Sequence, residues 1–333
     1  MTMLARRLLT ALLALFLLPA CQTSNLADAA VTEPAEIIHL WPESPPGGVP
    51  EGLAEKIVER DNPFGLLDRA VHEVTQPSLT IFRSPQPDGS VVLIIPGGGY
   101  KWVVIDKEGF EGARYFAAQG ATVYVLRYRL PHQGWQAGAD APLQDAQRAV
   151  RVIRSRAAKD GIDPSRVMVM GFSAGGHVAG TLQTGFDAHV YEPVDQADAL
   201  SARPDATALI YPVATMHLPF AHPGSRLNLI GEAPSPDAEA AWSVDHRVRA
   251  GQPPVFLMHA EDDEAVPVEN SLMVYEALRE AGVPVSMHLF ETGGHGFGLR
   301  GIAGTPLEAW PGLVMDWGRA QGIFAPEPAK SPT

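Results

Sequence analysis

One short glycine-rich segment holds a residue that can act as a nucleophile. Residues 171–175 read Gly-Phe-Ser-Ala-Gly, the pattern G-x-S-x-G, and lie between an apolar segment and a segment rich in Ala and Gly. A strand-to-helix turn of this kind is so tight that it needs glycines, and it projects the serine hydroxyl above the sheet at a helix N-terminus. The alternative is a plain turn with a capping serine. We favour Ser173 as the nucleophile because both flanking elements required by the pattern are present.

A second glycine-rich loop can bind a developing negative charge. Residues 96–100 read Pro-Gly-Gly-Gly-Tyr and follow the β-branched segment 91–95. Successive glycines let backbone N–H groups point into a cavity, where they stabilise the oxyanion formed when a nucleophile attacks a carbonyl group. We expect the N–H groups of Gly98, Gly99 and Ala174 to form this oxyanion hole. A phosphate-binding loop is excluded because neither glycine motif for nucleotides follows, and a plain loop remains the alternative.

An acidic segment follows a later apolar strand. Residues 259–264 read His-Ala-Glu-Asp-Asp-Glu. A carboxylate at the end of a strand can orient a catalytic histidine, although a run of acids is usually a solvated loop. We choose Asp263 over Asp262 because Asp263 lies four residues after His259 and four before Pro267, a spacing found in many hydrolases.

One histidine lies between glycines after the last expected strand. Residues 293–297 read Gly-Gly-His-Gly-Phe, so the ring of His295 is free to reach a serine on a neighbouring loop. The order Ser173, Asp263, His295 is also that of the α/β-hydrolases. We expect His177, four residues after the serine, to pack inside the following helix. His222 is expected either to touch substrate or to lie in a loop.

The segments around these residues alternate between strands and helices. We expect strands at 91–95, 122–128, 167–170, 208–212, 255–259 and 285–290, and helices at 109–119, 143–157, after Ser173, at 267–280 and at 307–319. This alternation predicts an α/β fold with a mostly parallel central sheet and helices on both faces. One domain over 36–325 is expected because no linker within it is long enough to separate two, with a disordered tail over 326–333.

Composition restricts the partners. The chain has 333 residues, of which 46% are hydrophobic, and a formal net charge of −13, which disfavours nucleic acid. The lone cysteine, Cys21, excludes an intramolecular disulfide and a Cys-based zinc site. The chemistry outlined above requires neither a metal nor an organic cofactor.

The N-terminus has the features of an export signal. Arg6 and Arg7 precede the apolar run 8–18, which is too short to span a bilayer, and Leu-Pro-Ala-Cys at 18–21 resembles a bacterial lipobox. We therefore expect residues 1–20 to be a signal peptide, Cys21 to be lipidated and 22–35 to be a flexible tether. The protein would then be exported and held to a membrane only by its lipid. The alternative is an ordinary signal peptide with an incidental cysteine.

Together these motifs resemble the α/β-hydrolase superfamily, in particular its acetyl xylan esterase-like or BD-FAE-like branch. The segments that carry the resemblance are 96–100 (Pro-Gly-Gly-Gly-Tyr), 126–129 (Leu-Arg-Tyr-Arg), 145–149 (Asp-Ala-Gln-Arg-Ala), 161–166 (Gly-Ile-Asp-Pro-Ser-Arg), 171–177 (Gly-Phe-Ser-Ala-Gly-Gly-His), 253–256 (Pro-Pro-Val-Phe) and 293–297 (Gly-Gly-His-Gly-Phe). Many lipases and esterases have His before the glycines, where this chain has Pro96.

The resemblance implies a serine esterase that removes a small acyl group, with acetyl groups on xylan or other plant carbohydrates as the first candidate. A general carboxylesterase for small esters and a single-domain serine peptidase are the alternatives. Tyr100 and Trp102, beside the glycine loop, are expected either to line the acyl or sugar pocket or to pack in the core. Asp145 matches a buried acid of the family, which we interpret as structural.

Overall fold

The computed structural model describes residues 33–326, so the expected signal peptide, Cys21 and all but the first residue of the C-terminal tail lie outside the described residues. Within 33–326, no helix is long and apolar enough to cross a bilayer. The backbone N–H of Ala35, inside the expected tether, donates to the carbonyl of Ile81. The ordered domain therefore begins no later than this residue.

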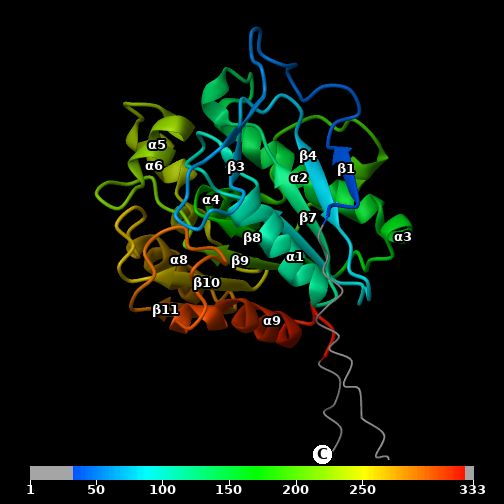
Figure 1. Ribbon diagram of the computed structural model, residues 1–333. Coiled ribbons are helices and arrows are strands. Elements are labelled where there is room, and N and C mark those ends of the chain that lie inside the picture. Colours follow the sequence, from blue (N-terminus) through cyan, green and yellow to red (C-terminus); the bar gives the residue numbers. More distant parts are fainter. Residues whose placement is uncertain (1–32, 327–333) are drawn as a thin grey trace, which may run out of the picture.

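An eight-stranded sheet forms the centre of the molecule (Figure 1). Its order is β1 (Glu36–His39), β4 (Ser78–Phe82), β7 (Thr122–Arg127), β5 (Val91–Ile95), β8 (Val167–Phe172), β9 (Ala206–Ile210), β10 (Val255–Ala260) and β11 (Val285–Phe290). The pairs from β7 to β11 are parallel, whereas β1–β4 and β4–β7 are antiparallel. The predicted mostly parallel sheet is confirmed, and the sequence prediction missed β1 and β4.

The helices cover both faces of this sheet, as expected for a mostly parallel sheet whose central strands are buried along their whole length. They are α1 (Glu111–Ala118), α2 (Ala141–Ser155), α3 (Ala157–Asp160), α4 (Ala174–Gly185), α5 (Pro223–Ile230), α6 (Pro236–Trp242), α7 (Val244–Arg247), α8 (Glu269–Glu280) and α9 (Trp310–Ala320). A π-helical turn, η2 (Asp106–Phe110), leads into α1, and short 3₁₀ turns are η3 (Pro131–Gln133), η4 (Gly138–Asp140), η5 (Gln196–Ala199) and η6 (Pro306–Ala309). The segments predicted as helices at 109–119 and 307–319 therefore do not begin as α-helices: the first begins in the π-helical turn η2 and the second in the 3₁₀ turn η6.

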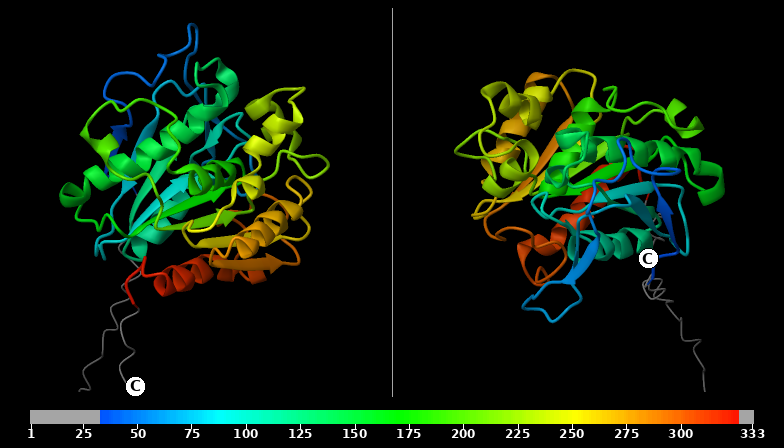
Figure 2. Two further views of the ribbon diagram at one scale, coloured as in Figure 1. Left: turned by 180° about the vertical axis from the view of Figure 1, so that it is seen from behind. Right: turned by 90° about the horizontal axis from the view of Figure 1, so that it is seen from above.

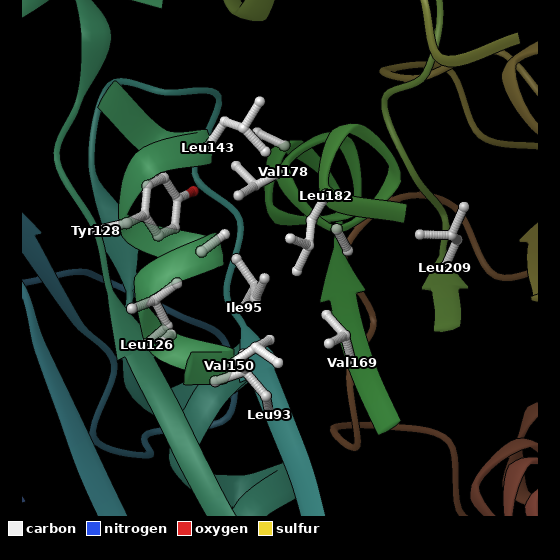
Figure 3. Packing of buried hydrophobic residues seen from close by; sticks show 14 of the residues in the cluster. Leu93, Ile95, Leu126, Tyr128, Leu143, Val150, Val169, Val178, Leu182 and Leu209 are labelled. Carbon is white, nitrogen blue, oxygen red and sulfur yellow. The ribbon is translucent and has the colours of Figure 1, made fainter. Parts of the chain in front are cut away.

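Alternation along β5 divides the core into two layers. Leu93 and Ile95 pack with α2, α4 and α8, whereas Val92 and Ile94 pack with α1 and α9. Seen from behind, α2, α4 and α8 lie in front of the sheet (Figure 2, left). Figure 3 shows the first layer, where Val150 of α2 lies against these strand residues. The core thus holds β5 and β8 rigidly, and both functional loops begin at the ends of these strands.

Two smaller features complete the fold. A three-stranded sheet of β2 (Lys56–Glu59), β3 (Arg69–His72) and β6 (Val103–Val104) lies beside the glycine loop. Asp145 on α2 is fully buried, accepts hydrogen bonds from the buried Arg129 guanidinium and from Trp41 Nε1, and thereby joins three segments. This arrangement is that of a structural ion pair.

Candidate active site

Ser173 stands in the turn between β8 and α4. Its backbone has φ 52° and ψ −121°, a left-handed conformation that residues with side chains rarely adopt. The flanking glycines are required by close approach, because a Cβ on Gly171 would lie 2.3 Å from the Gly175 carbonyl oxygen and one on Gly175 would lie 2.1 Å from that of Ile95. The turn therefore holds the hydroxyl above the carboxyl end of the sheet.

The structure brings Ser173, His295 and Asp263 together. Ser173 Oγ lies 2.8 Å from His295 Nε2, and His295 Nδ1 lies 2.6 Å from Asp263 Oδ2. Asp263 follows β10 and His295 follows β11, so the ends of three parallel strands supply the three side chains. The arrangement fits a hydroxyl whose proton is accepted by an imidazole that a carboxylate orients.

The Asp263 carboxylate has further partners. Its Oδ1 accepts the backbone N–H groups of Ala265 and Val266, and its Oδ2 also lies 3.2 Å from His259 Nε2. Burial opposes ionisation of this group, but the hydrogen bonds from His259 and His295 outweigh it and hold the pKa of Asp263 well below its usual range. The carboxylate stays ionised and keeps the Nδ1 proton of His295 directed toward it.

Asp262 has a different place. Its Oδ1 accepts the backbone N–H groups of Gly293 and Gly294, at 2.8 and 2.7 Å. These residues directly precede His295, so Asp262 positions the loop that carries the histidine rather than the imidazole itself.

The glycine loop presents unpaired backbone donors beside the serine. Gly98 and Gly99 have φ values of 128° and 62°, and a Cβ on Gly98 would lie 2.3 Å from the Trp102 carbonyl oxygen. None of the hydrogen bonds made among residues 33–326 uses the N–H of Gly98, Gly99 or Ala174. These groups are therefore available to stabilise an oxyanion.

Two residues that sequence reasoning missed support this loop. Glu108 Oε2 accepts the N–H of Gly97, and Glu108 Oε1 accepts the Tyr211 hydroxyl at 3.3 Å. The Tyr211 hydroxyl also accepts the N–H of Gly298, and its ring contacts His295 at 5.2 Å between centroids. Glu108 comes from the π-helical turn η2, and no spacing in the sequence links it to Tyr211 or to His295. This buried chain connects the oxyanion loop to the histidine loop.

A cavity of about 290 Å³ opens beside Ser173. Trp102, Gly98, Gly99, His222 and His295 are among its lining residues. Trp102 therefore lines this cavity, which is one of the two places that the sequence left open for it.

Tyr100 lies in the core, so the interpretation that it binds substrate is corrected, and the alternative of core packing holds. Its side chain is 1% exposed, belongs to the core, and its hydroxyl lies 2.7 Å from His177 Nδ1. His177 Nε2 lies 2.6 Å from the Trp242 carbonyl oxygen, which can only accept, so Nε2 donates there and Nδ1 accepts from Tyr100. Burial lowers the pKa of His177 to about 4. His177 therefore packs as a neutral structural residue inside α4.

His222 has a defined tautomer in the cavity wall. It caps α5, because its Nδ1 accepts the backbone N–H of Ser225 at 3.1 Å. Burial, together with the nearby His295, lowers the pKa of His222. The neutral ring therefore carries its proton on Nε2, and no hydrogen bond among the described residues uses that N–H. Within 33–326 there is also no group of three His, Cys, Asp or Glu side chains arranged to hold a metal ion.

Comparison with known proteins gives consistent matches. The family model described as BD-FAE matches residues 79–278. Two curated relatives are an endo-1,4-beta-xylanase B of Butyrivibrio fibrisolvens, 38% identical over 62% of this chain and 32% of its own, and an acetylxylan esterase of Xylanibacter ruminicola, 32% identical over 75% and 49%. This chain thus spans about a third and about half of their lengths.

A solved structure matches over more of its length. The acetyl ester-xyloside bifunctional hydrolase of Caldicellulosiruptor lactoaceticus has a TM-score of 0.72 and 34% identity, over 87% of this chain and 97% of that one. Carboxylesterase NlhH of Mycobacterium tuberculosis is 29% identical over 83% of this chain and 84% of its own.

Proposed function

This chain belongs to the BD-FAE family of α/β-hydrolases, and from that membership we propose that it is a serine esterase for short-chain carboxylic esters. The observation that carries the proposal is the connected chain of Ser173, His295 and Asp263, with contacts of 2.8 and 2.6 Å. An orienting carboxylate, a base and a hydroxyl in this order are the parts needed for acyl transfer.

The first half of the reaction forms an acyl-enzyme. Ser173 Oγ attacks the carbonyl carbon of the ester while His295 Nε2 takes the hydroxyl proton, and Asp263 stabilises the resulting imidazolium. The carbonyl oxygen becomes an oxyanion that the N–H groups of Gly98, Gly99 and Ala174 bind. When the intermediate collapses, the C–O bond to the alcohol breaks and His295 donates its proton to the leaving oxygen.

The second half releases the acid. A water molecule enters where the alcohol left, and His295 takes one of its protons as the oxygen attacks the acyl carbon. The same N–H groups bind the second oxyanion. Collapse of this intermediate breaks the bond to Ser173 Oγ, which regains the proton from His295.

We infer that the acyl group is acetyl and that the alcohol is a carbohydrate, with xylan first. A cavity of about 290 Å³ lies at the small end of ligand sites, which span about 300–1,000 Å³, and so favours short acyl groups. The relatives named for acetylxylan or acetyl ester-xyloside substrates support the alcohol. The match to carboxylesterase NlhH covers similar shares of both chains, 83% of this one and 84% of that one, and this favours the second candidate, a general carboxylesterase.

The test compares the full chain with its Ser173→Ala variant on p-nitrophenyl acetate, p-nitrophenyl butyrate and acetylated xylan. We expect Ser173-dependent release of acetate from xylan and faster cleavage of the acetyl than of the butyryl ester. Serine-dependent cleavage of only the small esters would favour the general carboxylesterase. If neither kind of ester is cleaved in a serine-dependent way, the esterase proposal fails and peptide substrates come first.

We also propose that the protein is exported and anchored through a lipid on Cys21, on the basis of the segment 18–21. In a bacterial host, the wild-type chain should fractionate with membranes. It should also incorporate labelled palmitate when the cells are grown with it, whereas a Cys21→Ser chain should incorporate none, whether or not its signal peptide is removed. Absence of label from the wild-type chain would contradict the lipid anchor.

A further inference from the structure

A second, larger cavity adjoins the one beside Ser173. It has a volume of about 480 Å³ and shares four lining residues with the first: Arg60, Lys107, His295 and Gly296. We call it the outer cavity. The glycine loop lines only the first cavity, whereas Arg300, Gly301, Ile302, Thr305 and Leu307 line only the outer one. The shared histidine therefore lies between the two spaces.

The proposed mechanism divides an ester between these spaces. Its carbonyl oxygen must face the N–H groups of Gly98 and Gly99, which places the acyl carbon in the first cavity. The leaving oxygen must be within reach of His295, which protonates it. Because His295 also lines the outer cavity, the alcohol part of the substrate extends into that space.

Two loops form the walls of the outer cavity. One is the loop between β2 and β3, which projects from the molecule (Figure 2, right), and the other follows β11. Arg300 joins them, since its Nη2 donates to the Leu67 carbonyl at 2.7 Å. The Phe64 ring lies close to Gly301, where an added Cβ would be 2.9 Å from Phe64 Cζ. Phe64 is nevertheless 51% exposed, so an aromatic surface remains open at the cavity.

The charged groups of the outer cavity balance one another. Arg60 donates two hydrogen bonds to Asp68, and Arg300 pairs with Glu111, so neither guanidinium is left to attract an anion. Lys107 and Asp61, which also line the cavity, carry opposite charges. The lining therefore suits an uncharged polar ligand better than a phosphate or a carboxylate.

Two charged side chains of the lining are themselves buried. Asp68 Oδ1 and Arg300 Nη1 make no hydrogen bond within the described residues, and Nη1 lies 3.6 Å from Asp68 Oδ2, at the distance of an ion pair rather than of a good hydrogen bond. Because solvent does not reach either atom, this pair adds little exposed charge to the cavity.

We propose that the outer cavity is the subsite for the sugar ring that carries the ester, with an apolar ring face on Phe64 and hydroxyl groups toward the polar side chains of the lining. An uncharged pyranose has both an apolar face for an aromatic ring and hydroxyl groups of mixed polarity. This inference rests on the proposed esterase function. The inference also identifies the part of the protein that would distinguish a carbohydrate ester from an ester of a simple alcohol.

The test measures two acetate esters with different alcohols. Acetylated xylo-oligosaccharides fill the outer cavity, whereas the ethyl group of ethyl acetate is too small to reach Phe64. We expect Phe64→Ala to raise KM for the oligosaccharide about three- to tenfold, with kcat within about twofold, and to leave kcat/KM for ethyl acetate unchanged. Phe64→Tyr, which keeps the ring, should restore the wild-type KM.

Leu66→Ala is the matched control, because Leu66 belongs to the same loop, is 49% exposed and does not line the cavity. Leu66→Ala should change neither KM for the oligosaccharide nor kcat/KM for ethyl acetate. Equal effects of Phe64→Ala on both esters, or no effect on the oligosaccharide, would overturn the subsite while the esterase function stands. Wild-type cleavage of ethyl acetate but not of the oligosaccharide would also overturn it. Absence of Ser173-dependent cleavage of either ester would instead refute the function on which the subsite rests.

Discussion

The neighbouring carboxylates of Asp262 and Asp263 hold one loop at two different points. Asp263 contacts the imidazole of His295 at 2.6 Å, whereas Asp262 accepts backbone N–H groups from the two glycines that precede it. Two adjacent residues thus have different roles: Asp263 orients the imidazole, and Asp262 supports the loop that carries it.

This difference predicts unequal effects of the same substitution. Asp263→Asn removes the charge that orients the imidazole and should lower kcat about 10⁴-fold. Asp262→Asn keeps an oxygen that can accept both N–H groups, so its kcat should stay within about tenfold of wild type. Steady-state kinetics on p-nitrophenyl acetate measures both, with circular dichroism to show that each variant is folded. Equal losses of kcat in the two variants would contradict the assignment of the orienting role to Asp263 alone.

A second prediction concerns the free N–H of His222. Asn at this position keeps an acceptor at the δ1 position for the Ser225 N–H, so the cap of α5 survives, but it lacks the ring Nε2–H that borders the cavity. We expect His222→Asn to lower kcat/KM about three- to tenfold with little change in melting temperature, because one hydrogen bond to substrate is lost. Ser225→Ala, which leaves Nε2 in place, serves as control. A lower melting temperature with unchanged kcat/KM would show that the residue acts only as a cap.

The buried His177 predicts a specific pH dependence of stability. Its pKa is about 4 in the folded chain and 6.5 when unperturbed, so between these values the unfolded chain binds a proton that the folded chain does not. The free energy of unfolding should therefore fall as pH falls, by about 2 kcal/mol from pH 7 to pH 5.

Urea unfolding of the wild type and of His177→Gln at these two pH values isolates this contribution. Gln cannot titrate, yet it can still donate to the Trp242 carbonyl and accept from Tyr100. Other histidines affect both chains alike, so the difference between the two pH dependences belongs to His177. Parallel pH dependences would mean that the imidazole is protonated in the folded chain.

A fourth prediction contrasts two glycines. A Cβ on Gly175 would lie 2.1 Å from the Ile95 carbonyl oxygen and 2.4 Å from that of Pro96, whereas one on Gly312 in α9 would meet nothing within 4 Å. Gly175→Ala should cost at least about 2 kcal/mol of stability, because backbone atoms must move apart. Gly312→Ala should stabilise the chain by up to about 1 kcal/mol through its better helix propensity. Thermal or urea unfolding compares the two, and equal effects would exclude the close approach.

The sequence predicted those parts of the molecule whose signals are local. Segment 91–95 is a strand with the expected bounds because it is a continuous apolar run that ends at glycines. Segment 285–290 also has the expected bounds, although Ser286 and His288 interrupt its apolar residues. The runs of β1 and β4 are short and contain polar residues, and their pairing, such as Glu36 opposite Ile81, joins segments far apart in the chain. Pairing between such distant segments produces no periodic pattern in the local sequence.

The same division applies to the site. Motifs and strand ends identified Ser173, Asp263 and His295, which the structure brings together. Glu108 and Tyr211 meet only through tertiary packing and belong to no motif. The position of Tyr100 also depended on packing, because a residue next to a functional loop can turn either toward the cavity or into the core.

The backbone of Ser173 carries a consequence for the stability of this chain. A residue with a side chain held at φ 52° and ψ −121° costs about 1–3 kcal/mol relative to an unstrained one, and glycine would relieve most of that strain. Of two inactive chains, Ser173→Gly should therefore unfold at a higher temperature than Ser173→Ala. On the proposed function, the hydroxyl group that reacts is therefore held at a position where glycine would make the fold more stable.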